Sequence, residues 1–150
     1  MRGLSFFAGG ELFAVDVTLV EKVIRNIPFT KIPAAPEAVL GIASIKGGIV
    51  TILSLTELLG RKKGPKASNA VIFKPFTNGN DQMGLLIEKP GGLIDIDDNE
   101  ILPPPFLAYE GNKHCISSMA EVDGVLYRII NIDSIINRYK SSENAGETVT

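Results

Sequence analysis

Short segments of β-forming apolar residues, separated by turn residues, run along almost the whole chain. Residues 4–8 and 11–17 flank Gly9-Gly10, and they predict a tight hairpin because glycine accepts a positive φ without steric cost. Short strands at this spacing indicate an all-β fold of two small barrels or curled sheets with about five strands each. Further strands are predicted over 70–76, 83–88, 93–96, 115–122 and 125–132.

The segment GIASIKGGIV, residues 41–50, places Lys46 beside two glycines in the most hydrophobic part of the chain. With Gly47-Gly48 as a two-residue loop, Lys46 faces Ile49, and side chains alternate between the two faces of the hairpin. A slip of one residue in this register would exchange the faces. The predicted core face carries Ala43, Ile45, Val50 and Ile52. The predicted outer face carries Ser44, Lys46, Ile49 and Thr51.

Polar residues at capping positions predict short helices between the strands. Thr18 followed by Glu21 has the spacing of a capping box and predicts a helical turn. The apolar residues Val23, Ile24 and Ile27 then predict a strand.

A second capping box, Ser54 with Glu57, predicts a helix that ends at Gly60. Asp133 predicts the start of a last helix that continues to Tyr139. Two short helices therefore follow the two apolar hairpins of the chain.

Prolines and glycines predict the connections between these elements. The sequence PEAVLG, residues 36–41, predicts one helical turn stopped by Gly41, and KPGG, residues 89–92, predicts a turn before the next strand. Longer irregular or polar segments are predicted over 61–66, 97–112 and 140–150.

The two halves of the chain end alike. Residues 44–59 and 120–136 each read as a strand, a glycine-containing turn, an apolar strand, a polar cap and a short helix. Their spacing differs by one residue and their identity is low, so the pattern suggests a repeated unit without establishing one.

Composition narrows the class of protein. The chain of 150 residues fits one domain, and 15 Lys and Arg against 17 Asp and Glu argue against a protein that binds phosphate backbones. Its single cysteine excludes an internal disulfide. Residues 1–10 lack a basic-then-apolar leader, and no uncharged apolar run reaches the ~18 residues of a membrane span, which predicts a soluble cytoplasmic protein.

Catalytic and metal-binding patterns are weak. His114 and Cys115 are adjacent, so in an extended segment their side chains would point to opposite faces and would not form a dyad. Residues 95–100, DIDDNE, offer carboxylate oxygens, but Glu100 and Phe106 replace the glycine and glutamate that a calcium loop needs. We therefore predict no enzyme, no cofactor and no metal.

A binding module remains, because small β-barrels bind partners through strand edges and exposed apolar surface. The candidates are Val20, Val23, Ile24, and Ile49 beside Lys46. For each apolar residue an ordinary core role is at least as strong an interpretation as a role in binding.

Three stretches of the chain form a specific pattern through their order and spacing: LSFFAGGELFAVDVTLVEKVI, TKIPAAPEAVLGIASIKGGIVTILSLTELLG and MGLLIEKPGGLIDIDDNEILPPP. The first contains Asp16 and a Val-x-x-Val-Ile segment, and the second contains Gly41 before a strand that ends in a basic residue and glycine. Over about Leu4 to Tyr139 the chain thereby resembles the CheW-like domains of bacterial chemotaxis.

The resemblance implies two intertwined five-stranded SH3-like β-barrels with a few short helices. They would form one domain over residues 1–139, with subdomains over about 10–66 and over 1–9 plus 67–139, and residues 140–150 would be a flexible polar tail.

The resemblance also implies a non-catalytic adaptor that couples methyl-accepting chemoreceptors to the histidine kinase CheA. One barrel end would contact the regulatory domain of CheA. The cytoplasmic tip of the receptor would lie in an apolar groove between the barrels, and these partners would recruit the chain to membrane arrays.

Carried over by position, Lys46 and Gly47 match an Arg-Gly pair of the family, and Val20, Val23 and Ile24 match positions beside the groove. These residues are the expected partner-binding residues, together with Ile49 and Lys22.

Two lysines depart from the family pattern. Lys46 lacks the planar fork of arginine, which can bind a carboxylate through two parallel hydrogen bonds. Lys22 stands where the family often has glutamate, so one possible charge partner has changed sign. Both residues bear on the choice of partner.

Three alternatives stay open at this point. The chain can be a CheW-like paralogue that serves another array, for motility or gene regulation. A small barrel that binds nucleic acid is a more distant alternative, disfavoured by the pI of about 5.4. An enzyme is the most distant one.

Overall fold

A computed structural model of the chain describes residues 1–33, 35, 38–60, 68–76, 82–102 and 115–137. Strands predominate among these residues, which confirms the all-β prediction. The strands are β1 (Arg2–Ala8), β2 (Glu11–Asp16), β3 (Val20–Ile24), β4 (Thr30–Lys31), β5 (Val39–Ile45), β6 (Gly48–Ser54), β7 (Asn69–Phe73), β8 (Gln82–Ile87), β9 (Lys89–Asp95), β10 (Ile116–Val122) and β11 (Val125–Ile130). The short helices are η1 (Val17–Leu19), α1 (Leu55–Leu58) and η2 (Asp98–Glu100), and residues 132–137 are also helical.

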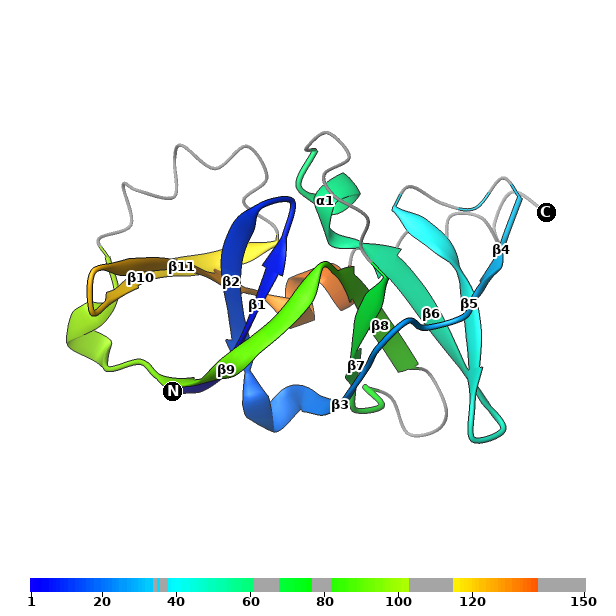
Figure 1. Cartoon of the computed structure of the whole chain (residues 1–150), viewed down its shortest axis with the longest axis horizontal. Helices are drawn as coiled ribbons and strands as arrows, with labels where there is room; N and C mark the ends of the chain where they lie inside the picture. Colours follow the sequence, from blue (N-terminus) through cyan, green and yellow to red (C-terminus); the bar gives the residue numbers. More distant parts are fainter. Residues whose placement is uncertain (34, 36–37, 61–67, 77–81, 103–114, 138–150) are drawn as a thin grey trace.

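The strands form two sheets that lie next to each other along the long axis of the molecule (Figure 1). Sheet A has the order β10-β11-β2-β1-β9, and sheet B has the order β3-β7-β8-β6-β5-β4, in which β4 is only two residues long. Each sheet therefore combines strands from both halves of the sequence. This exchange is the intertwined arrangement that the resemblance implied.

The chain passes from one sheet to the other after β2 and again after β8. The subdomain limits expected near residues 9 and 66 stay a prediction. The hairpin of β1 and β2 stays together in sheet A, because Gly9 (φ 59°) and Gly10 (φ 78°) form its tight turn. Similarly, β7 and β8 remain paired in sheet B.

The apolar residues form three clusters. The largest lies between the sheets and includes Phe6 and Phe13, whose rings stack with centroids 5.8 Å apart, and the helical residues Ile132, Ile135 and Ile136. Figure 1 shows this last helix, in orange, between the two sheets. A second cluster lies within sheet B: Ile27, Ala43, Val50, Ile52, Ala70 and Ile72. A third lies within sheet A: Ala14, Ile96, Ala120 and Ile129.

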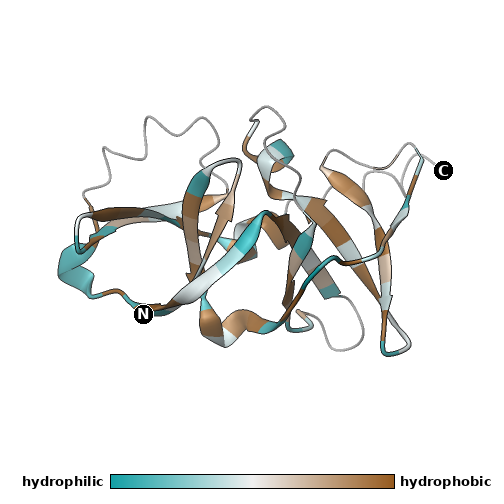
Figure 2. Cartoon of the chain, in the orientation of Figure 1, coloured by the Kyte–Doolittle hydropathy of each residue, from teal (hydrophilic) through white to brown (hydrophobic). Residues whose placement is uncertain are grey.

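Hydropathy follows this arrangement of sheets. Hydrophobic residues continue along most strands of sheet B, whereas the turn around η2, at the outer end of sheet A, is hydrophilic (Figure 2). The arrangement agrees with two barrel-like units, each curled around its own apolar cluster and joined by the cluster between the sheets.

The register of the β5–β6 hairpin differs from the prediction. The turn is Lys46-Gly47 and not Gly47-Gly48, and Ile45 pairs with Gly48 while Ser44 pairs with Ile49. The predicted faces nevertheless hold for the strand residues: Ala43, Val50 and Ile52 are buried, and Ser44 and Ile49 are exposed. Ile49 thus pairs with Ser44 instead of Lys46, a shift of two residues along β5. Because side chains alternate with a period of two, such a shift leaves each side chain on its predicted face. Lys46, however, lies in the turn and not on the outer face.

The corrected turn makes the two halves of the chain more alike. Asp123-Gly124 forms the corresponding two-residue turn between β10 and β11, with Val122 opposite Val125. Ser54 follows Gly47 by seven residues, Asn131 follows Gly124 by seven, and each accepts a hydrogen bond from the first turn of the following helix. The two halves therefore have the same spacing between the turn glycine and the helix cap, without the one-residue difference that the sequence suggested.

Two of the three predicted helix caps are wrong. Asp16, not Thr18, caps η1, because its carboxylate accepts hydrogen bonds from both the backbone N and the hydroxyl of Thr18. Asn131, not Asp133, caps the last helix through its side-chain oxygen. In each case the actual cap lies two residues earlier, at the end of a strand. Ser54 caps α1 as predicted, with 3.3 Å between its hydroxyl and the backbone N of Glu57.

Two predicted connections are strands instead. Gly41 does not stop a helical turn but lies inside β5, opposite Lys31 of β4. Residues 89–92 do not form a turn but begin β9, which runs along β1 with a bulge between Leu4 and Phe6. Pro90 can occupy this place because β9 is the last strand of sheet A.

The strand predicted through Val23 and Ile24 ends at Ile24, and Ile27 is buried beyond its end. The predictions for residues 61–66, 103–112 and 140–150, and for Tyr139, lie outside the described residues. Among the described helices, none has the length and apolar character needed to cross a membrane.

Candidate partner-binding surface

The tip of the β5–β6 hairpin is the most exposed of the predicted sites. Lys46 (φ 49°) and Gly47 (φ 80°) both have left-handed backbone conformations, as a type I′ turn requires. Ile49 follows on the outer face of β6 and is 62% exposed, the largest value among the exposed large apolar residues of the described chain. The sequence thus places an exposed apolar side chain next to a cation at a rigid turn.

Hydrogen bonds and strand pairing align this tip with the start of β3. The backbone N of Lys74, directly after β7, donates to the carbonyl of Leu19, and the side chain of Gln82 donates to the carboxylate of Glu21 at 2.6 Å. Gln82 begins β8 and pairs with Val50 of β6. The start of β3, the end of β7, the start of β8 and the β5–β6 turn therefore lie along one edge of sheet B.

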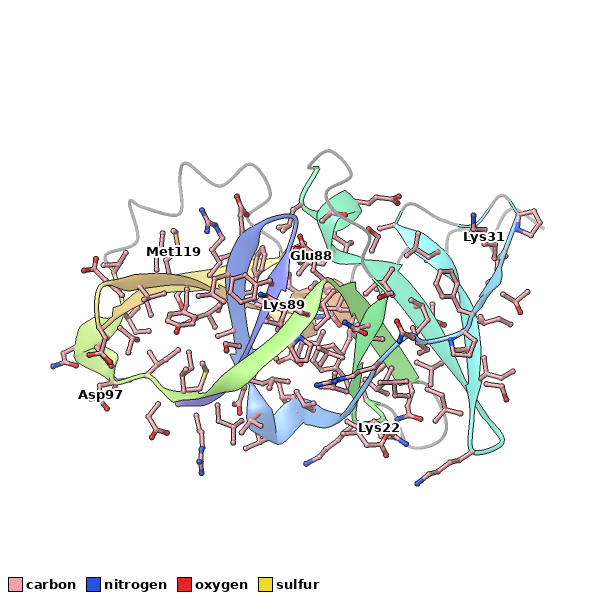
Figure 3. All side chains as sticks on the ribbon, in the orientation of Figure 1. Lys22, Lys31, Glu88, Lys89, Asp97 and Met119 are labelled. Atoms are coloured by element: carbon pink, nitrogen blue, oxygen red, sulfur yellow. The ribbon has the colours of Figure 1, made fainter. Side chains whose placement is uncertain are left out.

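We call this edge the hairpin edge. Figure 3 shows Lys22 at this lower side of sheet B, away from Lys31. Its residues are Lys22 of β3, Lys74 after β7, Gln82 of β8, Lys46 and Gly47 of the turn, and Ile49 of β6.

The three apolar candidates on β3 do not share one surface. Val20 and Val23 are partly buried against the cluster between the sheets, whereas Ile24 packs against the cluster inside sheet B. The bulge between Val20 and Lys22 puts Val20 and Val23 on the same side, and alternation then turns Ile24 to the other side. Their role in binding stays a prediction.

A second exposed apolar feature was missed in the sequence. Leu93 is 52% exposed on β9, where it pairs with Leu4 of β1, and Leu4 packs against the cluster between the sheets. Leu19 is 37% exposed on η1, which contacts β1. We call Leu4, Leu19, Val20 and Leu93 the junction strip.

The sequence predicts a strand over 93–96 but not its pairing with β1, because it predicts a turn over 89–92. Alternation places Leu93 on the same face as Asp95, opposite Ile94 and Ile96. This pattern is the sequence signal for an exposed Leu93.

The candidates for chemistry do not form a site in the described part of the chain. Cys115 is 1% exposed, with its sulfur 3.8 Å from the carbonyl of Leu58, and His114 lies outside the described residues. Asp97 caps η2 by accepting from the backbone of Glu100, whose carboxylate accepts from the N of Asp97. Among the described residues, no group of three or more His, Cys, Asp or Glu side chains is placed to hold a metal ion.

Comparison with known proteins gives a consistent result. The family described as "CheW-like domain" matches residues 2–140. The chemotaxis protein CheW of Rhizobium meliloti is 24% identical over 132 residues, which cover 88% of this chain and 84% of the relative. The chemotaxis protein CheW of Helicobacter pylori is 23% identical over 141 residues, which cover 92% and 82%.

Among solved structures, the scaffolding protein TtCheW from Thermoanaerobacter tengcongensis superposes with a TM-score of 0.75 and 26% identity, covering 87% of this chain and 88% of the other. These matches confirm the resemblance drawn from the sequence and its fold. With them, the expectation of a non-catalytic chemotaxis scaffold, and not an enzyme, is confirmed.

Proposed function

The chain belongs to the CheW-like domain family, and we propose that it couples methyl-accepting chemoreceptors to the histidine kinase CheA. Two separate surfaces support this proposal, one for each partner. The observation that carries it is the hairpin edge, where Ile49 is 62% exposed beside the turn of Lys46. Exposed apolar surface with a rim of polar residues is typical of protein–protein contact sites.

The regulatory domain of the kinase is the proposed partner of the hairpin edge. Ile49 would enter an apolar contact there, and Lys46 would reach carboxylates around it. Gly47 holds the turn that presents both residues, since its φ of 80° favours glycine.

The receptor tip is the proposed partner of the junction strip. Leu93 and Leu19 offer apolar area on elements that both contact β1, next to the partly buried Val20. A helical hairpin can cover such a strip with its apolar side chains, as helices do in apolar surfaces of other proteins. Receptors in the membrane would then recruit the chain to their arrays.

Two single variants test whether the surfaces are separate. Ile49→Glu should reduce binding to CheA by about tenfold or more and leave binding to a receptor fragment unchanged, and Leu93→Glu should do the reverse. Both side chains are mostly exposed, so neither change should cost much stability. Binding of the purified chain to each partner by calorimetry measures the effects.

Val125→Glu is the matched control, because Val125 is 41% exposed on β11 and belongs to neither surface. A wild-type chain that binds neither CheA nor receptor would contradict the proposal. Binding of a different kinase with the same dependence on Ile49 would favour the alternative, a paralogue that serves another array.

A further inference from the structure

The small net charge of the chain conceals a separation of charge between its sheets. Among the described residues, 17–88, which contain all of sheet B, carry five Lys and Arg and three Asp and Glu, a net charge of +2. The other described residues, which contain all of sheet A, carry three Lys and Arg and nine Asp and Glu, a net charge of −6. In the part of the chain that the structure describes, sheet A therefore carries an excess of acidic residues and sheet B a small excess of basic ones.

Five acidic residues in or next to the strands of sheet A are exposed, whereas Glu11 and Asp16 of β2 are partly buried. Figure 3 shows Asp97 at the end of the molecule opposite Lys22 and Lys31. The side chain of Asp95 is 84% exposed. The five exposed residues are Asp95, Asp97, Asp98, Glu121 and Asp123.

The cations of sheet B gather at the hairpin edge. Lys22, Lys46 and Lys74 come from three different segments that strand pairing brings to the same edge. Within the described part of the chain, no carboxylate forms an ion pair with any of the three. The acid nearest to them in sequence, Glu21, accepts a hydrogen bond from Gln82.

We infer that the hairpin edge selects a protein surface that carries carboxylates opposite Lys22 and Lys46. This inference rests on the proposed function and adds the chemistry of the partner: the contact domain of the kinase must be acidic where it meets this edge. Unpaired lysines around an exposed apolar centre raise the association rate of an acidic surface and repel a basic one. The acidic residues described on sheet A further orient the approach, since they repel the same acidic surface.

Reversal of charge at the edge tests the inference. The variant Lys22→Glu/Lys46→Glu should bind the cognate kinase roughly tenfold more weakly or worse at about 50 mM salt, mainly through a slower association rate. At about 300 mM salt the difference should shrink to within about threefold, because salt screens exposed charges. Surface plasmon resonance with the full chain and the kinase gives both rates.

Lys31→Glu is the matched control, because Lys31 is an exposed lysine of sheet B away from the hairpin edge. It should change binding by less than about twofold. Lys46→Asn removes the charge while suiting the turn, so it separates loss of charge from loss of fold.

The possible outcomes separate this inference from the function beneath it. Salt-independent binding that tolerates both reversals would overturn the inference and leave the adaptor function intact. No binding of the kinase at any salt would contradict both. Salt-dependent self-association of the wild-type chain in sedimentation experiments, without kinase binding, would overturn the inference in favour of a second copy, whose acidic end would be the partner.

Discussion

The backbone conformation of Lys46 is unfavourable for stability, whereas its charge favours the proposed contact with a partner. Its φ of 49° lies in the left-handed region, which costs a non-glycine residue roughly 1–2 kcal/mol, although asparagine and aspartate adopt it more readily. The equivalent turn of the second half uses Asp123 at φ 51°, a residue that suits the conformation. A lysine at this position is unfavourable for folding, and its charge gives a reason for its presence.

Replacement of Lys46 by asparagine should therefore stabilise the protein while it weakens partner binding. We expect Lys46→Asn to raise the free energy of unfolding by about 1 kcal/mol, because Asn-Gly is a favoured type I′ pair. Urea denaturation followed by circular dichroism measures the change. Asp123→Asn is the control and should be nearly neutral, and an equal gain in both variants would show that strain at Lys46 is not the cause.

At the scale of single elements, close packing of strands decides where glycine is required. A Cβ at Gly41 would overlap the carbonyl oxygen of Thr30 and lie 3.0 Å from the ring of Phe29. Gly41 therefore allows β4 to approach β5, with Thr30 opposite Ile42 and Lys31 opposite Gly41. The sequence contains the glycine but does not show that Thr30 lies against it, so the local pattern alone predicts the end of a helical turn at Gly41.

The substitution Gly41→Ala should separate β4 from β5. We expect a loss of about 1–3 kcal/mol of unfolding free energy, because backbone atoms of β4 would have to shift. The matched control is Gly92→Ala in β9, where an added Cβ meets no atom within 4 Å and should change stability by less than about 0.5 kcal/mol. Equal effects in both glycine variants, measured by thermal unfolding, would contradict the role assigned to Gly41.

Local patterns predicted the elements of this fold well and their partners poorly. The hairpin turns at Gly9-Gly10 and Asp123-Gly124 and the cap at Ser54 depend on neighbouring residues, and the structure has them as predicted. The β5–β6 register is set by the two turn residues, which must adopt a positive φ. Lysine is not a residue that typically adopts this conformation, so the sequence did not indicate Lys46 as the first turn residue. The strand character of residues 89–92 depends on β1, which lies far away in the sequence.

The candidate site shows the same division. Exposure of Ile49 followed from alternation alone, which survives an error of register. The gathering of Lys22 and Lys74 near Lys46 follows from the pairing of β3 with β7 and of β8 with β6, which no local pattern specifies. In the junction strip, alternation gives a sign of the exposed Leu93, but its position beside Leu4 depends on the pairing of β9 with β1, which lies far away in the sequence.

At the scale of the whole molecule, the crossing after β8 connects the two sheets through Glu88. Its backbone N donates to the carbonyl of Phe7, and its carboxylate accepts from the N of Gly10 at 2.6 Å. Asn69 of β7 donates to the carbonyl of Glu88 and accepts from the N of Asn26. Polar contacts and the apolar cluster between the sheets thus join both units, so we expect one cooperative unfolding transition.

Because strands from both halves of the chain pair in each sheet, we expect that neither half folds by itself. A cut between residues 66 and 67 leaves β3 in the first fragment without β7, its partner, and leaves β9 in the second fragment without β1. Each fragment retains hairpins, which are marginal in water by themselves. We expect each fragment alone to lack a cooperative unfolding transition.

Mixed in equal amounts, the two fragments should recover the fold of the intact chain, because all of the exchanged strand pairs can then form. The midpoint of thermal unfolding should rise with the concentration of the mixture, since association is bimolecular, whereas that of the intact chain should not. Circular dichroism and calorimetry on the fragments, the mixture and the intact chain measure this. Cooperative unfolding of either fragment alone would mean that a single sheet with its own cluster is sufficient for folding, and that the cluster between the sheets is dispensable.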